Sequence, residues 1–529
     1  MRSTGLFIAL FVIGCEMPSP LPGRDAEADA PTVLDAGRTP ALAFSTCARV
    51  TEGDESGAEC AWLEVPLDHA STEGPTLSLF VKRITADPTM PHRGALVLSN
   101  GGLVSSGVDL EPSIDFWLAK APGYDLYIPD HRGTGRSGRL GCASAEDPAS
   151  EGGWAITDGE LPACIAALEA THGDTLPLFS AEQAAHDIAT LVEAIREIES
   201  GRVMLYGISY GSFLVQRYLH VEPDGVDGVV LDGLCNPGTC TMSEYDGWTG
   251  ELAERFFGEC ARDPFCSDRL GPDPAARARE VLDSLDEGHC PEAVAAGLER
   301  DTVRAVISGI LSYLGWSLRP VAAALVHRLG RCDAGDVRAL SQFARTYLAL
   351  PPTAPVSERL ASRFTGFEVA FRALWQTPPP TIEALATQHE SALASLGTSL
   401  SLGRIRETYP VRDIDPSAST FPVTGVPMLL LHGTLDLIPD RSADAAREAY
   451  TAPHQTYVSI PRAPHATIFA PTTEGRGCAG ALIEQFTIDP RSTLDTSCVD
   501  HIAEIDWDTL PGTYATALFG VADFWDGAP

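Results

Sequence analysis

The chain of 529 residues is strongly acidic, because 72 Asp and Glu stand against 37 Lys and Arg, for a formal net charge of -35. Lys82 and Lys120 are the only lysines, so arginine supplies almost all of the positive charge. Such a surface excludes nucleic acids and anionic lipids as expected partners, since both are negatively charged. The length allows several domains, and the hydrophobic fraction of 44% is ordinary for a globular protein with a sizeable core.

The N-terminus has the pattern of an export signal. Arg2 precedes an apolar stretch at 6–13 that is too short to span a bilayer, and Gly14 and Cys15 follow it. This pattern resembles the bacterial lipoprotein signal, in which the cysteine becomes the lipidated first residue of the mature chain. The resemblance implies a signal peptide over 1–15, lipidation at Cys15, and anchoring to the cell envelope, in the periplasm or at the cell surface. The alternative is an ordinary cleaved signal that removes Cys15.

Export also bears on the other cysteines. Of the 13 cysteines, an even number remains without Cys15, and disulfides are the expected state outside the cytoplasm. A zinc site is the competing interpretation, but no Cys-x-x-Cys spacing supports it. Neighbours in sequence suggest pairs without fixing the connectivity, and two cysteines are left over. The near pairs are Cys47 with Cys60, Cys142 with Cys164, Cys235 with Cys240, Cys260 with Cys266, and Cys478 with Cys498, and the two others are Cys290 and Cys332.

Residues 16–46 are rich in Pro, Ala, Asp and Gly without periodicity, which predicts a flexible tether. Strand patterns follow, first as an antiparallel pair at a sheet edge and then as buried strands alternating with helices. One helix begins after Ser180, which forms a capping-box pattern with Gln183. This alternation predicts an α/β fold with a doubly wound, mostly parallel sheet. The predicted strands are 61–67, 77–84, 95–98, 125–129, 203–206, 226–231, 426–431 and 456–460.

The alternation of strand and helix patterns stops between residues 234 and 416, where only helical patterns occur. We expect this segment to be a helical cap that lies over the carboxyl ends of the strands, where such sheets bind ligands. The predicted organisation is therefore a core in two parts, 47–233 and 417–529, with the cap at 234–416 and a disulfide-bonded tail at the C-terminus. The predicted cap helices are 252–260, 275–285, 302–318, 321–329, 337–350 and 382–396.

The segment around Ser209 has the pattern of a nucleophile elbow. A buried strand precedes the serine, and apolar residues at helical spacing follow it. In this context the serine sits in a strained turn with its hydroxyl exposed above the sheet, and both flanking glycines avoid a collision. The alternative is a glycine-rich turn without chemistry. The motif is Gly207-Ile208-Ser209-Tyr210-Gly211.

A serine hydroxyl needs a base that takes its proton, and a histidine base needs an acid that holds one tautomer. In hydrolases with this elbow the acid follows the serine in the chain, and the histidine follows the acid. Downstream of Ser209, Asp436 and His465 each follow a predicted strand. Both loops are expected to open on the face that carries the serine, so we predict a triad of Ser209, His465 and Asp436.

Three residues compete for the roles of acid and base. Asp440 is a rival acid that lies further from the strand end than Asp436. His432 stands at the strand end, where a structural role is expected, and His454 precedes its strand and so belongs to the opposite edge. The alternative for His465 is a surface-loop histidine.

Acyl transfer also needs N–H donors that stabilise an oxyanion. The amide of Tyr210, directly after the nucleophile, is one expected donor. The loop Asn100-Gly101-Gly102 follows an early strand, and its glycines let the backbone approach a substrate closely. We assign the second donor to the amide of Gly102; the alternative is a plain turn.

Several motifs together resemble the prolyl iminopeptidase and tripeptidyl aminopeptidase group of exported α/β-hydrolases. The resemblance extends from about residue 47 to about 498 and includes the tail between Cys478 and Cys498. It implies an α/β-hydrolase fold and a serine peptidase that removes short N-terminal units from peptides. The motifs are Asp130-His131-Arg132-Gly133-Thr134-Gly135-Arg136-Ser137, Gly207-Ile208-Ser209-Tyr210-Gly211, Asp232-Gly233, Asp436-Leu437-Ile438-Pro439 and His465.

Two features bear on the substrate. The group usually has His-Gly-Gly-Pro-Gly at the oxyanion loop, whereas residues 100–104 are Asn-Gly-Gly-Leu-Val. Aminopeptidases of the group hold the substrate's amine with cap carboxylates, for which Glu244, Asp246 and Glu251 are candidates. In a chain this acidic, a solvated surface charge is the simpler interpretation of each.

We therefore expect a serine hydrolase, first of all an aminopeptidase on oligopeptides, that works through an acyl-enzyme without a metal or organic cofactor. A carboxylester hydrolase on the same scaffold is the first alternative, since the triad chemistry is shared. A non-catalytic binding lipoprotein is the second. The expected partners are a peptide or small ester substrate and, through the lipid anchor alone, a membrane. The sequence leaves the oligomeric state open.

Overall fold

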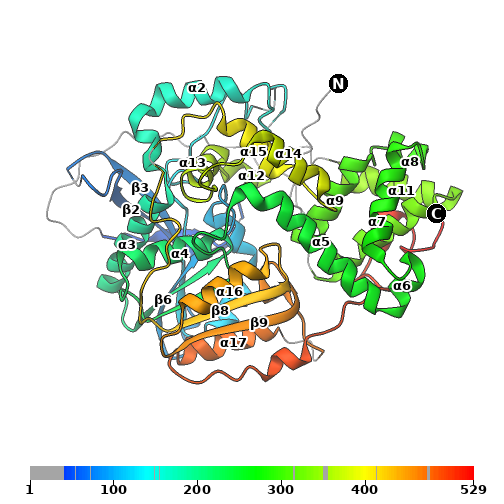
Figure 1. Ribbon diagram of the computed structural model, residues 1–529. Coiled ribbons are helices and arrows are strands. Elements are labelled where there is room, and N and C mark those ends of the chain that lie inside the picture. The colour runs from blue at the N-terminus through cyan, green and yellow to red at the C-terminus, as the bar shows by residue number, and fades with distance from the viewer. Residues whose placement is uncertain are drawn as a thin grey trace.

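The computed structural model describes residues 41–53, 55–71, 73–147, 149–153, 155–313, 316–349, 355–412, 414–473 and 477–529. The predicted signal peptide, Cys15 and most of the predicted tether lie outside the described residues. Figure 1 shows a central sheet with helices around it and a group of helices that extends to one side.

The sheet has nine strands in the order β1-β2-β3-β5-β4-β6-β7-β8-β9. The pairs β1–β2, β2–β3 and β3–β5 are antiparallel, and every pair from β5 through β4 to β9 is parallel. This confirms the predicted mostly parallel sheet with an antiparallel edge. The strands are β1 (Ser45–Ala48), β2 (Ser56–Pro66), β3 (Thr76–Ile84), β4 (Gly94–Ser99), β5 (Tyr124–Pro129), β6 (Arg202–Ile208), β7 (Gly228–Asp232), β8 (Met428–Leu435) and β9 (Gln455–Pro464).

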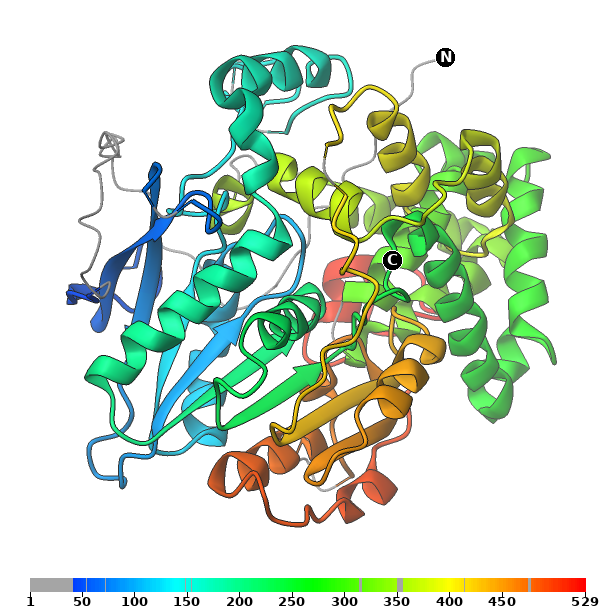
Figure 2. The same ribbon diagram turned by 60° about the vertical axis from the view of Figure 1, so that its left-hand side comes forward.

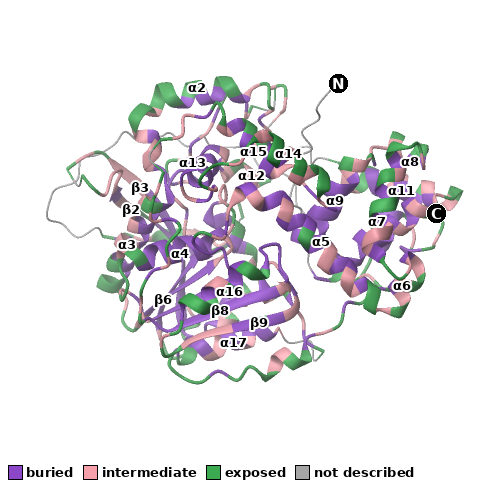
Figure 3. Cartoon of the chain, viewed as in Figure 1, coloured by how far each residue is buried: buried purple, intermediate pink, exposed green. Residues whose placement is uncertain are grey.

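Helices cover both faces of the sheet, which explains why its central strands are apolar throughout. Every residue of β4 and β7 is buried, and Figure 3 shows the same pattern across the middle of the sheet. Figures 1 and 2 place α3, α4 and α16 on one face and α17 on the other, where α1 packs against it. Up to residue 488, the α-helices outside the cap segment, α2 included, are α1 (Ile114–Lys120), α2 (Leu161–His172), α3 (Ala181–Ile198), α4 (Tyr210–Val221), α16 (Asp440–Ala449) and α17 (Cys478–Ile488).

The start of α3 corrects one prediction. The Ser180 hydroxyl accepts a hydrogen bond from the backbone N–H of Gln183, as a helix cap does. The reciprocal half of the predicted capping box is absent at this helix. The Gln183 side chain instead accepts a hydrogen bond from the backbone N–H of His69 and donates one to Asp68. A tertiary contact with the loop after β2 has therefore replaced the local one.

The segment between β7 and β8 is helical, as predicted, and its helices form two groups (Figure 1). Helices α13 to α15 lie near the sheet, and α6 to α11 extend away from it. The predicted helix 382–396 is wrong in one respect: it ends at Ser391, and a separate helix begins at Thr398. The cap helices are α5 (Tyr245–Arg262), α6 (Pro264–Leu270), α7 (Pro274–Asp286), α8 (Pro291–Ala295), α9 (Arg300–Tyr313), α10 (Pro320–Arg331), α11 (Ala334–Tyr347), α12 (Val356–Leu360), α13 (Arg363–Ala373), α14 (Ile382–Ser391) and α15 (Thr398–Arg406).

The break after Ser391 has a visible cause. Arg304, almost fully buried in α9, donates hydrogen bonds to the carbonyl oxygens of His389 and Ala392. These carbonyls are therefore satisfied by a side chain from another helix instead of by the next helical turn. The periodic pattern of the sequence continued through this point and gave no sign of the break.

Six disulfides are present in the structure. The five near pairs suggested by the sequence are all bonded, and so are Cys290 and Cys332, whose loop is the longest, with a sequence separation of 42. In the part of the chain that the structure describes, no helix is both long enough and apolar enough to cross a membrane.

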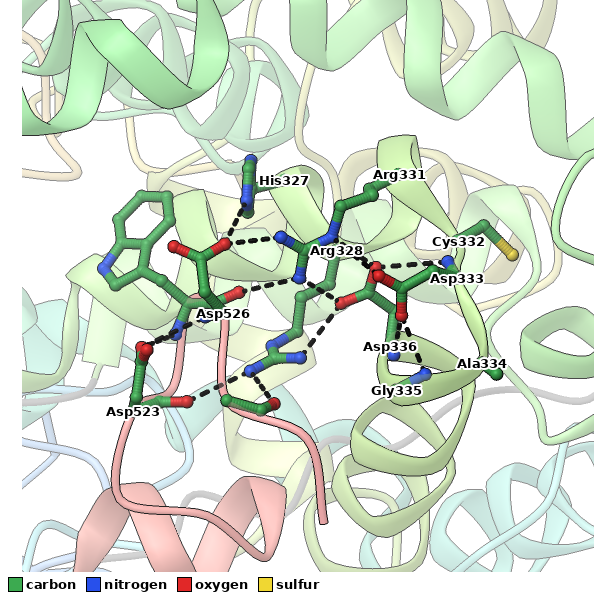
Figure 4. A network of polar contacts seen from close by, with 12 residues as sticks. His327, Arg328, Arg331, Cys332, Asp333, Ala334, Gly335, Asp336, Asp523 and Asp526 are labelled. Atoms are coloured by element: carbon green, nitrogen blue, oxygen red, sulfur yellow. Dashed lines mark hydrogen bonds and ion pairs between the residues drawn. The ribbon is translucent and has the colours of Figure 1, made fainter.

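The C-terminal residues pack on the cap, which the sequence did not predict. After α18 (Tyr514–Phe519), the last residues lie beside α10 and α11 (Figure 4). Arg328 is completely buried there and donates hydrogen bonds to the carbonyl oxygens of Phe524 at 2.8 Å and Gly527 at 2.9 Å. It also donates to the carbonyl oxygen of Asp523, at 3.1 Å, and to the buried Asp336 carboxylate, at 3.0 Å. The end of the chain thus closes one side of the cap instead of extending the core.

Candidate active site

The predicted site residues come together at one edge of the sheet. Ser209 follows β6, Asp436 follows β8 directly, and His465 follows β9. These three strands are parallel to one another, so their carboxyl ends meet at the same edge. The edge lies beneath the cap helix α5, which contacts β8.

Ser209 has the backbone strain expected of a nucleophile elbow. Its φ of 54° and ψ of -124° lie outside the regions that non-glycine residues favour. The flanking glycines are required for steric reasons: a Cβ on Gly207 would stand 2.3 Å from the carbonyl oxygen of Gly211, and one on Gly211 would stand 2.3 Å from that of Ser99. Half-buried Ser209 thus stands on a turn that the surrounding backbone fixes.

His465 and Asp436 form a direct pair. The Nδ1 atom of His465 lies 2.7 Å from Oδ1 of Asp436, whose side chain is completely buried. The same carboxylate oxygen accepts a hydrogen bond from the backbone N–H of Ile438. Because an ionised carboxylate can only accept, Nδ1 carries the proton and Nε2 is left free to act as a base.

The pair shifts both pKa values in opposite directions. Burial disfavours the imidazolium of His465, but the Asp436 carboxylate outweighs it, so the pKa of His465 is raised. Burial likewise opposes the charge on Asp436, but the imidazolium and its hydrogen bond lower the pKa of Asp436 below its usual range. The site therefore favours an ionised acid next to a histidine that is readily protonated.

The rival residues are engaged elsewhere. Nε2 of the buried His432 lies 3.2 Å from Asp440, so these two form a pair of their own beside the predicted triad. Nδ1 of His432 stands 3.9 Å from Oδ2 of Asp436 and has no hydrogen-bond partner among the described residues. His454 precedes β9, and its carbonyl accepts a hydrogen bond from Met428 at the start of β8. It belongs to the opposite edge of the sheet.

The dipeptide Asp232-Gly233 connects the serine to the histidine. The backbone N–H of Ser209 donates a hydrogen bond to the carbonyl oxygen of Asp232, at 2.9 Å. Gly233 packs so closely on the imidazole that a Cβ there would stand 2.9 Å from Cε1 of His465. In the described part of the chain no hydrogen bond joins Ser209 to His465 directly, which is common in substrate-free sites.

The predicted oxyanion loop lies against Ser209. A Cβ on Gly101 would stand 2.9 Å from Cβ of Ser209, so only a residue without a side chain fits there. The side chain of Asn100 holds the loop, since it accepts a hydrogen bond from the Gly101 amide and donates one to the carbonyl of Ser106. Gly102 has a φ of +79°, which glycine adopts readily. The altered sequence of this loop is therefore compatible with an ordered conformation.

The side chain of His131 contacts that of Tyr210 next to this loop. Its Nε2 lies 3.0 Å from the Tyr210 hydroxyl, and its Nδ1 lies 2.6 Å from the carbonyl oxygen of Arg132. Burial lowers the pKa of His131 to about 4, so the ring is neutral at physiological pH. Because a carbonyl only accepts, Nδ1 donates and Nε2 accepts from Tyr210. A cavity of about 40 Å³ beside this pair, lined also by Asn100 and Gly102, is large enough for water.

Two arginines of the cap bind the loop that carries Asp436. Arg255 of α5 donates hydrogen bonds to the carbonyl oxygens of Thr434, at 2.8 Å, and Asp436, at 2.7 Å. Arg319, completely buried just before α10, donates to the carbonyl of Leu435 at 3.1 Å. Cap side chains thus hold three successive carbonyls, the last two of β8 and that of Asp436. Burial lowers the pKa of Arg319 to about 9, although the Asp436 carboxylate opposes this.

The structure separates the three candidate cap carboxylates. Asp246 is completely buried and accepts hydrogen bonds from the backbone N–H groups of Thr398 and Ser399 at the start of α15. It is a structural cap and is not available to a substrate. Glu244 and Glu251 both form ion pairs with Arg441 of α16, next to Asp440. They share this one arginine, which offsets only one of their two negative charges.

One group of side chains among the described residues has the composition of a metal site. Possible ligand atoms of His92, Asp125 and Glu199 lie within 4.8 Å of one another. The group stands near the amino end of β5, at the opposite edge of the sheet from Ser209. Glu199 is already bonded to the Tyr127 hydroxyl, at 2.6 Å, and paired with Arg83, at 3.4 Å. These contacts account for its burial without a cation.

The sequence predicted the residues of the triad but not the residues that hold them in position. Asp232 appeared only within a motif, although it follows a predicted strand just as Asp436 and His465 do. That shared position was a usable signal. Arg255 and Arg319 gave no such signal, because arginines near helical patterns are usually solvated. Only the folded cap brings them to the loop of Asp436.

Comparison with known proteins supports the fold and gives related enzymes. A family model described as alpha/beta hydrolase fold matches residues 94–269. The tripeptidyl aminopeptidase of Streptomyces lividans is 27% identical over 194 residues, which is 34% of this chain and 36% of that protein. The serine protease Hip1 of Mycobacterium tuberculosis is 27% identical over 247 residues, 43% of this chain and 46% of its own. The matches thus span about a third to a half of these relatives.

Solved structures of low sequence identity are also similar. Proline iminopeptidase of Mycobacterium smegmatis matches with a TM-score of 0.36 and 13% identity, over 82% of this chain and 99% of its own. A thermophilic esterase of Thermogutta terrifontis matches with a TM-score of 0.33 and 14% identity, over 82% of this chain and 99% of its own. With its mostly parallel sheet, the turn at Ser209 and a family model that covers β4 to β7 and this turn, the chain has an alpha/beta hydrolase fold.

Proposed function

We propose that this protein is a serine hydrolase in which Ser209 is the nucleophile, His465 the base and Asp436 the acid that orients the base. The observation that carries the proposal is the 2.7 Å contact between His465 and Asp436 beside a serine held at a positive φ of 54°. Each residue follows a different one of the parallel strands, so the core brings all three to one edge of the sheet.

The reaction follows from these positions. His465 takes the hydroxyl proton of Ser209 through Nε2 as the oxygen attacks the substrate's carbonyl carbon, and the imidazolium is stabilised by Asp436. The tetrahedral intermediate collapses to an acyl-enzyme as His465 protonates the leaving group. Water then attacks the acyl carbon, with the same histidine as base, and releases the acid. Every proton transfer in this sequence uses the same atom, Nε2.

The oxyanion is assigned to the amides of Tyr210 and Gly102. Tyr210 is the first residue of α4, so its N–H lies at a helix end, where N–H groups lack partners within the helix. The amide of Gly101 already donates to Asn100, which leaves Gly102 as the adjacent donor in the loop. Two backbone donors of this kind favour charge that develops only in the transition state.

We further propose that the substrate is a peptide with a free N-terminus. This rests on the relatives named tripeptidyl aminopeptidase and serine protease, both at 27% identity. Glu244 and Glu251, in the cap near α16, are the groups proposed to bind the ammonium of such a substrate. To do so, they must exchange their ion pairs with Arg441 for contacts with the ammonium.

The second candidate is a carboxylester hydrolase. The observation that favours it is the loop at 100–104, which lacks the histidine and proline usual in the aminopeptidase group, while Gly101 still lies against Ser209. The triad chemistry does not distinguish an ester from an amide. Comparison of peptide p-nitroanilides with acyl esters of the same acyl part separates the two.

The decisive experiment is mass spectrometry of the mature protein incubated with matched peptides that have free or blocked N-termini. Release of one to three residues from free N-termini alone is expected. Cleavage of neither set, while a fluorophosphonate still labels Ser209, would favour the ester hydrolase. Absence of both labelling and hydrolysis would refute the serine-hydrolase proposal and favour a binding protein.

We also propose that the protein is exported and anchored through a lipid on Cys15. The six disulfides of the structure support export, because such bonds persist in oxidising compartments. Metabolic labelling with a fatty-acid analogue tests the anchor, and the Cys15→Ser protein is expected to lose the label.

A further inference from the structure

A second carboxylate is buried next to the predicted triad, in addition to that of Asp436. Asp232 is the last residue of β7, the strand between the one that leads to Ser209 and the one that leads to Asp436. It is completely buried, and the reaction proposed above does not use it. We propose that Asp232 is a positioning residue that fixes the loop of His465 against the turn of Ser209 and places a second negative charge near the imidazole. This role rests on the proposed function of the same site.

The side chain of Asp232 holds the histidine loop. Its Oδ1 atom accepts two hydrogen bonds from Thr467, one from the backbone N–H at 2.9 Å and one from the hydroxyl at 2.8 Å. Between Thr467 and His465 stands Ala466, whose φ of 68° is unusual for alanine. The chain therefore turns sharply just after the histidine, and the two bonds to Asp232 fix the end of that turn.

The backbone of the same residue holds the nucleophile. The carbonyl oxygen of Asp232 accepts the hydrogen bond from the N–H of Ser209, at 2.9 Å. The next residue, Gly233, packs on the histidine ring, and a Cβ there would also stand 3.4 Å from Oδ2 of Asp436. One dipeptide thus contacts all three members of the predicted triad. Since no direct bond joins Ser209 to His465, this connection determines their separation.

The hydrogen-bond partners of Asp232 suit a carboxylate, whereas its burial favours the neutral acid. Oδ1 faces the two donors of Thr467, and Oδ2 faces the hydroxyl of Tyr206 at 3.2 Å. Three donors and no acceptor suit a group that only accepts. Burial and the nearby Asp436 raise the pKa of Asp232, and the bonds from Thr467 oppose that shift. The charge of Asp232 in turn helps to raise the pKa of His465.

The test is the pH profile of kcat/KM for Asp232→Asn, a change that keeps the shape of the side chain and removes its charge. Loss of a negative charge near the imidazole lowers the pKa of His465. The acidic limb of the profile is therefore expected to move down by about 0.5–1 pH unit, less than the 1–3 units typical of a direct ion-pair partner. The value of kcat/KM at the plateau is expected to fall about tenfold as the loop loosens.

Two variants separate positioning from charge. Thr467→Val removes one hydrogen bond to Asp232 but keeps the carboxylate charged, so kcat/KM and the rate of fluorophosphonate labelling are expected to fall severalfold without a shift of the acidic limb. Tyr206→Phe is the matched control, because it removes the hydroxyl that faces Oδ2, the oxygen that does not bind Thr467. It is expected to lower the melting temperature more than the activity.

The outcomes distinguish this role from the function on which it rests. An Asp232→Asn protein with an unshifted acidic limb and a plateau within twofold of the wild type would refute the role alone. If Asp232→Asn does not fold, unchanged labelling of Thr467→Val would do the same. A wild-type protein that neither reacts with fluorophosphonate nor hydrolyses any substrate would refute the proposed function, and this role with it.

Discussion

Arg255 of the cap donates a hydrogen bond to the carbonyl oxygen of Asp436, at a distance of 2.7 Å. The two residues are far apart in the sequence, and one belongs to a cap helix while the other ends a core strand. The cap therefore contributes to the position of the predicted acid, in addition to covering the edge of the sheet. Its removal is expected to disturb the pair of Asp436 and His465, and not only substrate binding.

The role of Arg255 gives the first prediction. Arg255→Ala removes the hydrogen bonds to Thr434 and Asp436, so kcat is expected to fall about tenfold, with a smaller change in KM. Steady-state kinetics with one substrate measure both. The control is Arg279→Ala, which breaks an exposed ion pair with Glu254 on the same group of helices and is expected to leave kcat within twofold. Equal effects of the two changes would contradict a specific role.

Replacement of the proposed nucleophile, Ser209, gives the second prediction. Ser209→Ala is expected to reduce kcat by about 10⁴-fold or more and to abolish fluorophosphonate labelling, because no other group supplies the attacking oxygen. The fold should persist, since the hydroxyl of Ser209 makes no hydrogen bond among the described residues. Circular dichroism and the melting temperature check this. Full hydrolysis by the variant would exclude Ser209 as the nucleophile.

The raised pKa of His465 gives the third prediction. The base is active only when neutral, so kcat/KM should rise with pH through a midpoint above the ordinary value of 6.5. In Asp436→Asn the carboxylate no longer stabilises the imidazolium, so the midpoint is expected to move to lower pH while the plateau falls about 10⁴-fold. A profile measured from pH 5 to 9 checks both. An Asp440→Asn profile that shifts instead would assign the acid to the rival residue.

The disulfides give the fourth prediction. Cys290 and Cys332 close a loop with a sequence separation of 42, whereas Cys260 and Cys266 are 6 apart. On the chain-entropy relation, loss of the longer loop costs about 4 kcal/mol of unfolding free energy and loss of the shorter loop about 2 kcal/mol. Denaturant unfolding of the two double Cys→Ser variants measures the difference. A larger loss for the short loop would show that local packing dominates.

Much of the core was predictable from the sequence because its signals are local. Short apolar runs that end in turn residues, such as 203–206, are typical of strands buried on both faces, and the glycines around Ser209 are required by a turn that a few residues define. The positions of Asp436 and His465 followed from the rule that parallel strands end at one edge. Each of these inferences needed only neighbours in the chain.

Other features depended on contacts between distant segments. The Gln183 side chain bonds to the loop at Asp68 and His69 instead of completing the capping box. Arg304 binds a carbonyl near the end of the helix that stops at Ser391. No pattern in the sequence records such competition, because the competing partner is more than eighty residues away. The packing of the C-terminus on Arg328 is of the same kind.

The sequence by itself therefore determined the sheet, the strained serine and the candidates for acid and base, since these follow from the chemistry and spacing of adjacent residues. Only the tertiary structure decided which acid faces which histidine: Asp436 pairs with His465, and Asp440 with His432. It also placed Asp232 between the nucleophile and the base. The physical reason is that hydrogen-bond partners are chosen by distance in space, which the order of residues does not fix.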